Sequence, residues 1–214
     1  NQFWRTGYDG GSFYTPQMVA VSLEAEEPIW IGRKMDAVGA TSTSFLQPST
    51  LVPYPDLSVG SSQLHPIQFV AEEINRRGWG GGTVGVETDD YYYTAKWDAI
   101  LKHGLPNARF EDAFLLVNRC RMKKSAKELE YMHQAGQIAA AAQKAAFEKC
   151  EPGVRQCDVM AELYRVTTAG LPGFGGTFPC KPPNAMVSEL CSAPHLSWTG
   201  DPLGQSHVGE RVFG

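Results

Sequence analysis

The chain has 214 residues, of which 43% are hydrophobic and 20% are charged, so it is long enough for one medium-sized domain and part of a second. Its formal net charge of −4 gives no electrostatic reason to expect binding to nucleic acid or to an anionic membrane. No apolar run approaches the roughly 20 residues of a membrane span, and no secretory signal pattern opens the chain, so we expect a cytoplasmic protein. The five cysteines match no zinc module, and their odd number indicates reduced thiols in structural roles.

The first segments of the chain have the composition of strands. Residues 12–23 and 28–32 are rich in β-branched and aromatic side chains and flank an acidic turn, which predicts a β-hairpin. Residues 65–78 predict an amphipathic helix, because Pro66 stands near its start and Gly78 just past its end.

A short apolar strand is predicted next, at residues 83–87, followed by a helix at residues 91–103. Asp89 or Asp90 is the expected cap of that helix, and the three tyrosines that follow should divide between core and surface. The resulting order β-β-α-β-α predicts an α/β domain whose helices cover a mixed sheet.

Residues 110–124 lose this pattern and become basic, which indicates a connector between two domains. The sequence from Ser125 to Glu128 then fits a capping box, and the helix that it opens should run to about Cys150. The expected inner face of this helix is unusually small, so that its axis can lie close to a sheet; its members are Met132, Ala135, Ile138, Ala139, Ala142 and Ala146.

A further helix is predicted at residues 157–169, with Gln156 or Asp158 as its cap and Gly170 as its stop. Four prolines and four glycines then fall within residues 170–183, a spacing that no regular helix survives. This stretch is either a functional loop or a poorly ordered one, and the sequence leaves both open.

The second half of the chain resembles the creatinase/aminopeptidase P family (peptidase M24, the pita-bread fold). The resemblance rests on residues 121–128, on Ala135-Gly136, on Pro152-Gly153-Val154, and on the Gly/Pro-rich passage that leads to Ala193-Pro194-His195. It implies a mixed α/β (α+β) fold, with a creatinase-like N-terminal α/β domain at residues 1–118. The first part of the pita-bread catalytic domain would follow at residues 119–214.

Several local strings are most similar to the ectoine hydrolase branch of that family. They are residues 12–17 (SFYTPQ), 30–33 (WIGR) with Met35-Asp36, 91–95 (YYYTA), 156–158 (QCD), 175–176 (GG) and 192–198 (SAPHLSW). We expect the chain to lack both ends of the family's proteins, because its first seven residues resemble an interior strand passage and its last residues depart from the family's strand pattern.

The resemblance implies a catalytic role for His195, as the group that moves a proton beside the scissile bond. Imidazole titrates near neutral pH, which suits that role; a histidine of a surface loop is the alternative. Trp198 would form an apolar wall near a small substrate. Arg33 and Asp36 would bind substrate at an entrance, because in this family the N-terminal domain of one subunit approaches the active site of another; a surface ion pair is the alternative.

The peptidase members of the family hold two metal ions with two aspartates, a histidine and two glutamates, all of which lie downstream of the residue that corresponds to His195. Asp201, His207 and Glu210 lack the family's spacing, so we expect no metal ligands and no cofactor in this chain, while a divalent metal pair remains open for the complete protein. The expected function is hydrolysis of a small carbon–nitrogen bond substrate by a homodimer, with the isolated chain inactive. The alternatives are a metal-dependent Xaa-Pro aminopeptidase and a non-catalytic binding or dimerisation module.

Overall fold

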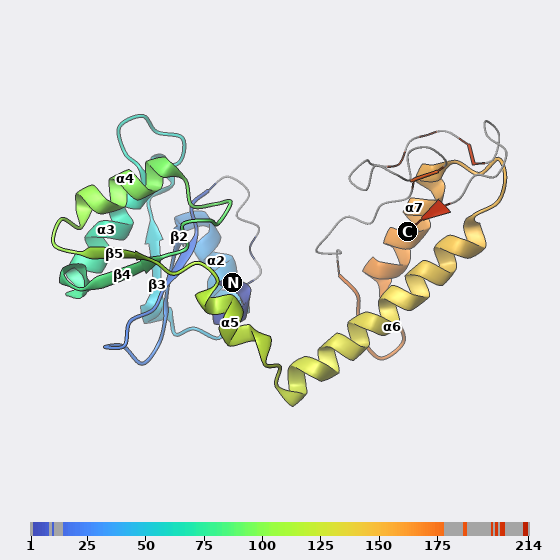
Figure 1. Cartoon of the computed structure of the whole chain (residues 1–214), viewed down its shortest axis with the longest axis horizontal. Coiled ribbons are helices and arrows are strands. Elements are labelled where there is room, and N and C mark those ends of the chain that lie inside the picture. Colours follow the sequence, from blue (N-terminus) through green and yellow to red (C-terminus); the bar gives the residue numbers. More distant parts are fainter. Residues whose placement is uncertain are drawn as a thin grey trace. The chain divides into compact units, whose positions relative to one another are not determined.

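The computed structural model of the chain describes residues 2–8, 10, 15–177, 186–187, 198, 200, 202–203 and 212–213. The chain divides into two compact units, Asn1–Lys123 and Lys124–Gly214 (Figure 1). The identification of two family domains that meet between residues 118 and 119 stays a prediction. Within the described residues, no helix combines the length and the apolar character that a membrane crossing requires.

The first unit contains a three-stranded sheet in the order β1-β2-β3, formed by Met18–Ala20, Ile29–Arg33 and Leu51–Tyr54. β1 and β2 pair antiparallel, which confirms the predicted hairpin. β2 and β3 pair parallel through a crossover that contains the helix α2 (Lys34–Thr43), and neither α2 nor β3 was predicted. Three shorter elements, α1 (Gln2–Thr6), η1 (Pro48–Thr50) and η2 (Asp56–Ser58), complete this part of the chain.

Both faces of β2 are buried, and each face is covered by a different helix. Ile29 and Ile31 are fully buried in a cluster with side chains of α3 (Pro66–Arg76). Trp30 points the opposite way, as alternation along a strand requires, and packs with Tyr8 and with Ala40 of α2. The strand therefore lies at the centre of the unit between α2 and α3.

The helix predicted at residues 65–78 is confirmed as α3. Pro66 is its first residue, its buried side chains include Ile67, Val70 and Ile74, and Gly78 follows it with a φ of 79°. Its N-cap, His65, was not predicted. A 3-10 turn, η3 (Trp79–Gly81), leads from the helix to β4 (Thr83–Val86), which confirms the strand predicted at residues 83–87.

The next helix, α4 (Ala95–Gly104), begins later than predicted and has a different cap. The hydroxyl of Thr94 accepts the backbone N–H of Trp97 at 3.2 Å, so Thr94 is the cap in place of Asp89 or Asp90. Asp90 instead accepts the backbone N–H of Tyr92 at 2.8 Å within the preceding turn. Tyr92 therefore lies outside the helix and is exposed, as Tyr91 is, whereas Tyr93 packs against the core.

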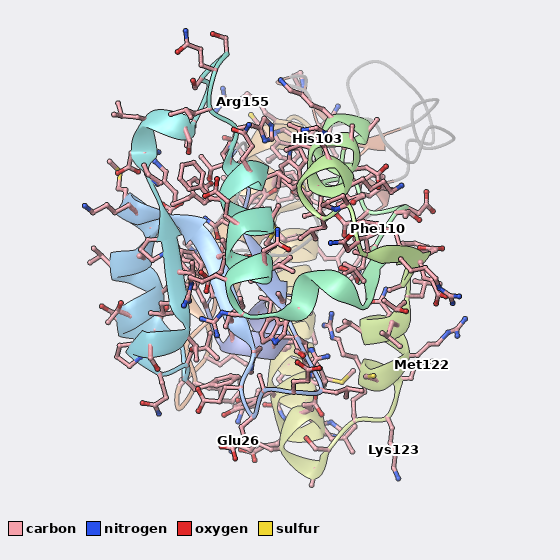
Figure 2. All side chains as sticks on the ribbon, turned by 90° about the vertical axis from the view of Figure 1, so that its left-hand side faces the viewer. Glu26, His103, Phe110, Met122, Lys123 and Arg155 are labelled. Atoms are coloured by element: carbon pink, nitrogen blue, oxygen red, sulfur yellow. The ribbon has the colours of Figure 1, made fainter. Side chains whose placement is uncertain are left out.

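The boundary between the two units falls at the end of residues 110–124, the predicted connector, but most of this stretch is regular structure that was not predicted. β5 (Arg109–Asp112) pairs parallel with β4, and α5 (Leu116–Met122) follows it. Figure 2 shows Phe110 on β5, and Met122 and Lys123 where α5 ends. The strand order and the helices confirm the mixed α/β class.

The second unit is built on two long helices that pack side by side, α6 (Ala126–Lys149) and α7 (Gln156–Ala169) (Figure 1). The predicted capping box is confirmed, because Ser125 accepts the N–H of Glu128 at 3.2 Å and donates its own N–H to the Glu128 carboxylate at 2.7 Å. Of the small face of α6, Ala142 and Ala146 are buried, and within the described residues this face meets α7 instead of a sheet.

The caps predicted for α7 are wrong, since Gln156 is its first residue and the N-cap, Arg155, makes no side-chain capping bond. The predicted stop at Gly170 is confirmed by its φ of 71°. A short antiparallel pair, β6 (Met186–Val187) and β7 (Val212–Phe213), also belongs to this unit. Cys120, Cys150 and Cys157 are free thiols, while Cys180 and Cys191 lie outside the described residues.

Candidate functional site

Two parallel strands end together on one edge of the first unit. The register pairs Arg33, the last residue of β2, with Tyr54, the last residue of β3. The backbone then enters α2 after Arg33 and η2 after Pro55. Because ligands of open α/β sheets bind beyond the carboxyl ends of parallel strands, we call this place the carboxyl edge and treat it as the candidate site.

Arg33 and Asp56 form an ion pair at the carboxyl edge. The Nε atom of Arg33 lies 2.7 Å from Oδ1 of Asp56, and the two side chains retain 21% and 37% of their accessible surface. The same Oδ1 accepts the backbone N–H of Met35, in the first turn of α2, at 3.3 Å. Asp56 therefore caps α2 from another element, which compensates for an N-cap residue, Arg33, that makes no capping bond of its own.

Asp36 lies in the first turn of α2, where the helix dipole favours a negative charge. Its Oδ2 accepts a hydrogen bond from Nε2 of Gln17 at 2.9 Å, and Gln17 in turn accepts one from Gln2 at 3.1 Å. This chain of amides joins α1, the approach to β1, and α2. The two site residues predicted in this unit, Arg33 and Asp36, thus stand three positions apart at one edge, each held by a polar partner.

Two tyrosines lie within the field of these charges. The hydroxyl of Tyr54 is buried and donates to the backbone oxygen of Pro16 at 2.5 Å. Burial raises the pKa of Tyr54, with a further rise from Asp36. Burial and then Asp36 also raise the pKa of Tyr8. Both phenols stay neutral at physiological pH, so the charges of the edge come from Arg33, Lys34, Asp36 and Asp56.

Trp198 belongs to the second unit. Its ring meets that of Tyr164, on α7, edge to face, with centroids 5.8 Å apart and planes at 65°. Farther along the chain, Leu203 is buried against α6 and α7 and exchanges backbone hydrogen bonds with Gly153 and Val154 at 2.6 and 2.7 Å. Trp198 itself is partly buried, and its predicted role as a wall of a binding site stays a prediction.

The predicted catalytic residue, His195, lies outside the described residues, as do Asp201, His207 and Glu210. In the part of the chain that the structure describes, no group of three or more His, Cys, Asp or Glu side chains could hold a metal ion. Asp56, Gln17 and Tyr164 were not predicted from the sequence as site residues. A polar residue two positions beyond the end of a strand, as Asp56 is beyond Tyr54, is a signal that could have identified the first of them.

No protein-family model matches the chain. The ectoine hydrolase of Halomonas elongata is 42% identical to it over 219 residues, which cover 100% of this chain and 54% of the relative. An uncharacterized hydrolase/peptidase of Sinorhizobium fredii is 43% identical over 194 residues, which cover 91% of this chain and 50% of the relative. The chain thus spans about half the length of the curated relatives it matches.

Solved structures show the same fold at much lower identity. The recombinant prolidase of Thermococcus sibiricus superimposes with a TM-score of 0.75 at 13% sequence identity, over 99% of this chain and 53% of that one. The shared architecture therefore extends over both units of the chain.

Proposed function

Since the chain belongs to the creatinase/aminopeptidase P family, we propose that it forms part of a hydrolase that cleaves a carbon–nitrogen bond of a small amide or amidine such as ectoine. The observation that carries this proposal is the 42% identity to an ectoine hydrolase along the whole chain. In the proposed organisation, residues 1–118 form the N-terminal domain and residues 119–214 begin the catalytic domain.

In the proposed mechanism His195 moves the proton. As a base it would take a proton from water, and as an acid it would return one to the leaving nitrogen; both steps suit a group that titrates near neutral pH. A carboxylate would either attack the substrate or activate water. It would come from the half of the relatives' length that this chain does not span. Trp198, held by Tyr164, would supply the apolar wall beside the substrate ring.

The carboxyl edge would contact the substrate from the other side. We propose a homodimer in which Arg33 and Asp36 of one subunit line the entrance to the active site of the second. Their geometry supports this role, because both are fixed by neighbouring side chains and a fifth of the Arg33 side-chain surface remains accessible. A fixed charged group loses less entropy on binding than a mobile one.

A second candidate is a metal-dependent Xaa-Pro aminopeptidase, which the fold shared with prolidases favours. The described residues of this chain supply no set of metal ligands, so in this candidate the ligands would come from other parts of the protein.

The test compares both reactions in the protein at its natural length. Hydrolysis of ectoine without added metal supports the proposal, whereas hydrolysis of an Xaa-Pro dipeptide by a protein with two bound metal ions supports the second candidate. A folded protein that cleaves neither overturns both and leaves a non-catalytic binding module. Within an active protein, His195→Ala should lower kcat by about 100-fold or more, while the exposed His133 of α6 gives the matched control His133→Ala.

A further inference from the structure

We propose that Asp56 is a positioning residue, which holds Arg33 in place for a carboxylate group of the substrate. The inference rests on the proposed function, in which the carboxyl edge contacts the substrate. It goes further in two ways: it assigns Asp56 as the residue that orders this edge, and a substrate carboxylate as the group that Arg33 binds. Asp56 follows β3, and Arg33 ends β2, so the contact exists only because the two strands pair in parallel.

One oxygen atom of Asp56 makes both contacts that matter. Oδ1 accepts from Nε of Arg33 at 2.7 Å and from the backbone N–H of Met35 at 3.3 Å. The guanidinium plane is thereby tied to the first turn of α2, a rigid element. A free arginine side chain carries about 2 kcal/mol of rotamer entropy, so an arginine that is already ordered binds a ligand at a smaller entropic cost.

The charge of the carboxyl edge indicates the kind of substrate. Arg33 and Lys34 are cationic, while Asp36 and Asp56 are anionic, so the edge carries both signs and no net charge. Such an edge suits a small zwitterion better than a simple anion. Guanidinium matches the planar geometry of a carboxylate, and the contact with Asp56 is made through Nε. A cationic amidine of the same substrate would face Asp36.

The test measures steady-state kinetics of ectoine hydrolysis in the protein at its natural length. Arg33→Ala and Asp56→Ala are each expected to raise KM by about tenfold, the effect of one charge-assisted hydrogen bond, with kcat changed by less than about twofold. Asp56→Asn keeps an oxygen acceptor for Arg33 and Met35, so its KM should lie between those of the wild type and of Asp56→Ala. It also tests the proposal if the alanine variant fails to fold.

The control separates this role from simple support of α2. Ala40 is buried in the same helix and packs with Tyr8 and Trp30, so Ala40→Gly should lower the melting temperature and leave KM unchanged. An unchanged KM in Asp56→Ala, beside a raised KM in Arg33→Ala, overturns the inference and leaves the proposed function intact. An unchanged KM in Arg33→Ala overturns the proposed role of the edge, and the inference falls with it. A KM raised equally by Ala40→Gly also overturns the inference.

Discussion

The Nδ1 atom of His65 lies 3.2 Å from the backbone nitrogen of Ile67 and accepts its hydrogen bond. The N–H of His65 in turn donates to the side chain of Gln68 at 2.8 Å, which completes a capping box at the start of α3. A ring nitrogen accepts only while it is unprotonated. Burial, and then the positive charge of Lys96 at the start of α4, lower the pKa of His65.

We therefore expect the first unit to lose stability as the pH falls below about 6.5, because the unfolded histidine then takes up a proton more readily than the folded one. His65→Asn, which offers an acceptor that does not titrate, should remove this part of the pH dependence. His65→Ala should cost ~1 kcal/mol at pH 8, the usual effect of a lost cap. Urea unfolding at pH 8 and pH 5.5 measures the pH dependence and the cost of losing the cap. The control is His103→Asn, at an exposed histidine. A wild-type pH profile in His65→Asn would contradict the prediction.

Glu73 is buried in α3 and pairs with two arginines, with distances of 2.6 Å to Arg76 and to Arg77. The hydrogen bond from Arg76, and then that from Arg77, lower the pKa of Glu73 against the opposing effect of burial. Glu73→Gln should lower the free energy of unfolding by about 1–3 kcal/mol at pH 7. This stabilisation is complete above the usual glutamate pKa of about 4.3 and is lost as the pH falls through the depressed folded value. Chemical denaturation measures it; an equal loss in the exposed neighbour Glu72→Gln would refute it.

Two glycines in helices should respond to alanine with opposite signs. A Cβ at Gly104, the last residue of α4, would lie 2.5 Å from the Cβ of Ala71 on α3, so Gly104→Ala should destabilise by about 1–3 kcal/mol. A Cβ at Gly136, within α6, meets nothing within 4 Å, and Gly136→Ala should stabilise by about 0.5–1 kcal/mol. Thermal unfolding of the two variants provides the comparison. If both variants changed the stability in the same direction, the close contact between α3 and α4 at Gly104 would be contradicted.

Leu115 has a left-handed backbone, with a φ of 64°, in the turn between β5 and α5. The turn is fixed by Asp112, whose carboxylate accepts the N–H of Phe114 at 2.9 Å and the hydroxyl of Thr88 at 2.7 Å. This conformation costs a residue other than glycine about 1–2 kcal/mol, and asparagine tolerates it better than other side chains. Leu115→Asn should therefore preserve or raise stability, whereas the β-branched variant Leu115→Val should lower it. Calorimetry on the two variants distinguishes them, and a more stable valine variant would contradict the assigned turn.

The sequence predicted those elements whose signals are local. The capping box at Ser125 and the glycine stops at Gly78 and Gly170 act within a few residues, so they can be read without knowledge of the fold. The helix α2 escaped prediction because its outer face carries Met35 and Val38 where polar residues are expected. Three hydroxyl residues near its end are also poor helix formers by themselves, and in the structure the hydroxyls of Thr41 and Ser42 donate to backbone oxygens of the same helix at 2.8 and 3.0 Å.

The candidate site shows the same division between local and distant information. Arg33 and Asp36 were identified from a string of adjacent residues that a family resemblance carries. Asp56 lies 23 positions from Arg33, and only the parallel register of β2 and β3 brings the two together. Tyr164 was missed for a similar reason, because its contact with Trp198 joins a helix to a segment that a Gly/Pro-rich passage separates from it.

The parallel pairing of β2 with β3, and of β4 with β5, has a consequence for the order in which the protein acquires its structure. Each pair forms only after the chain between its strands has been made and folded back, which is a slow step. The α6–α7 hairpin instead joins neighbouring segments through a short turn, so the contacts between its two helices form quickly once both have been synthesised. During synthesis the second unit should therefore gain its helices with little delay, while the carboxyl edge is completed only when residues 51–56 have docked beside β2.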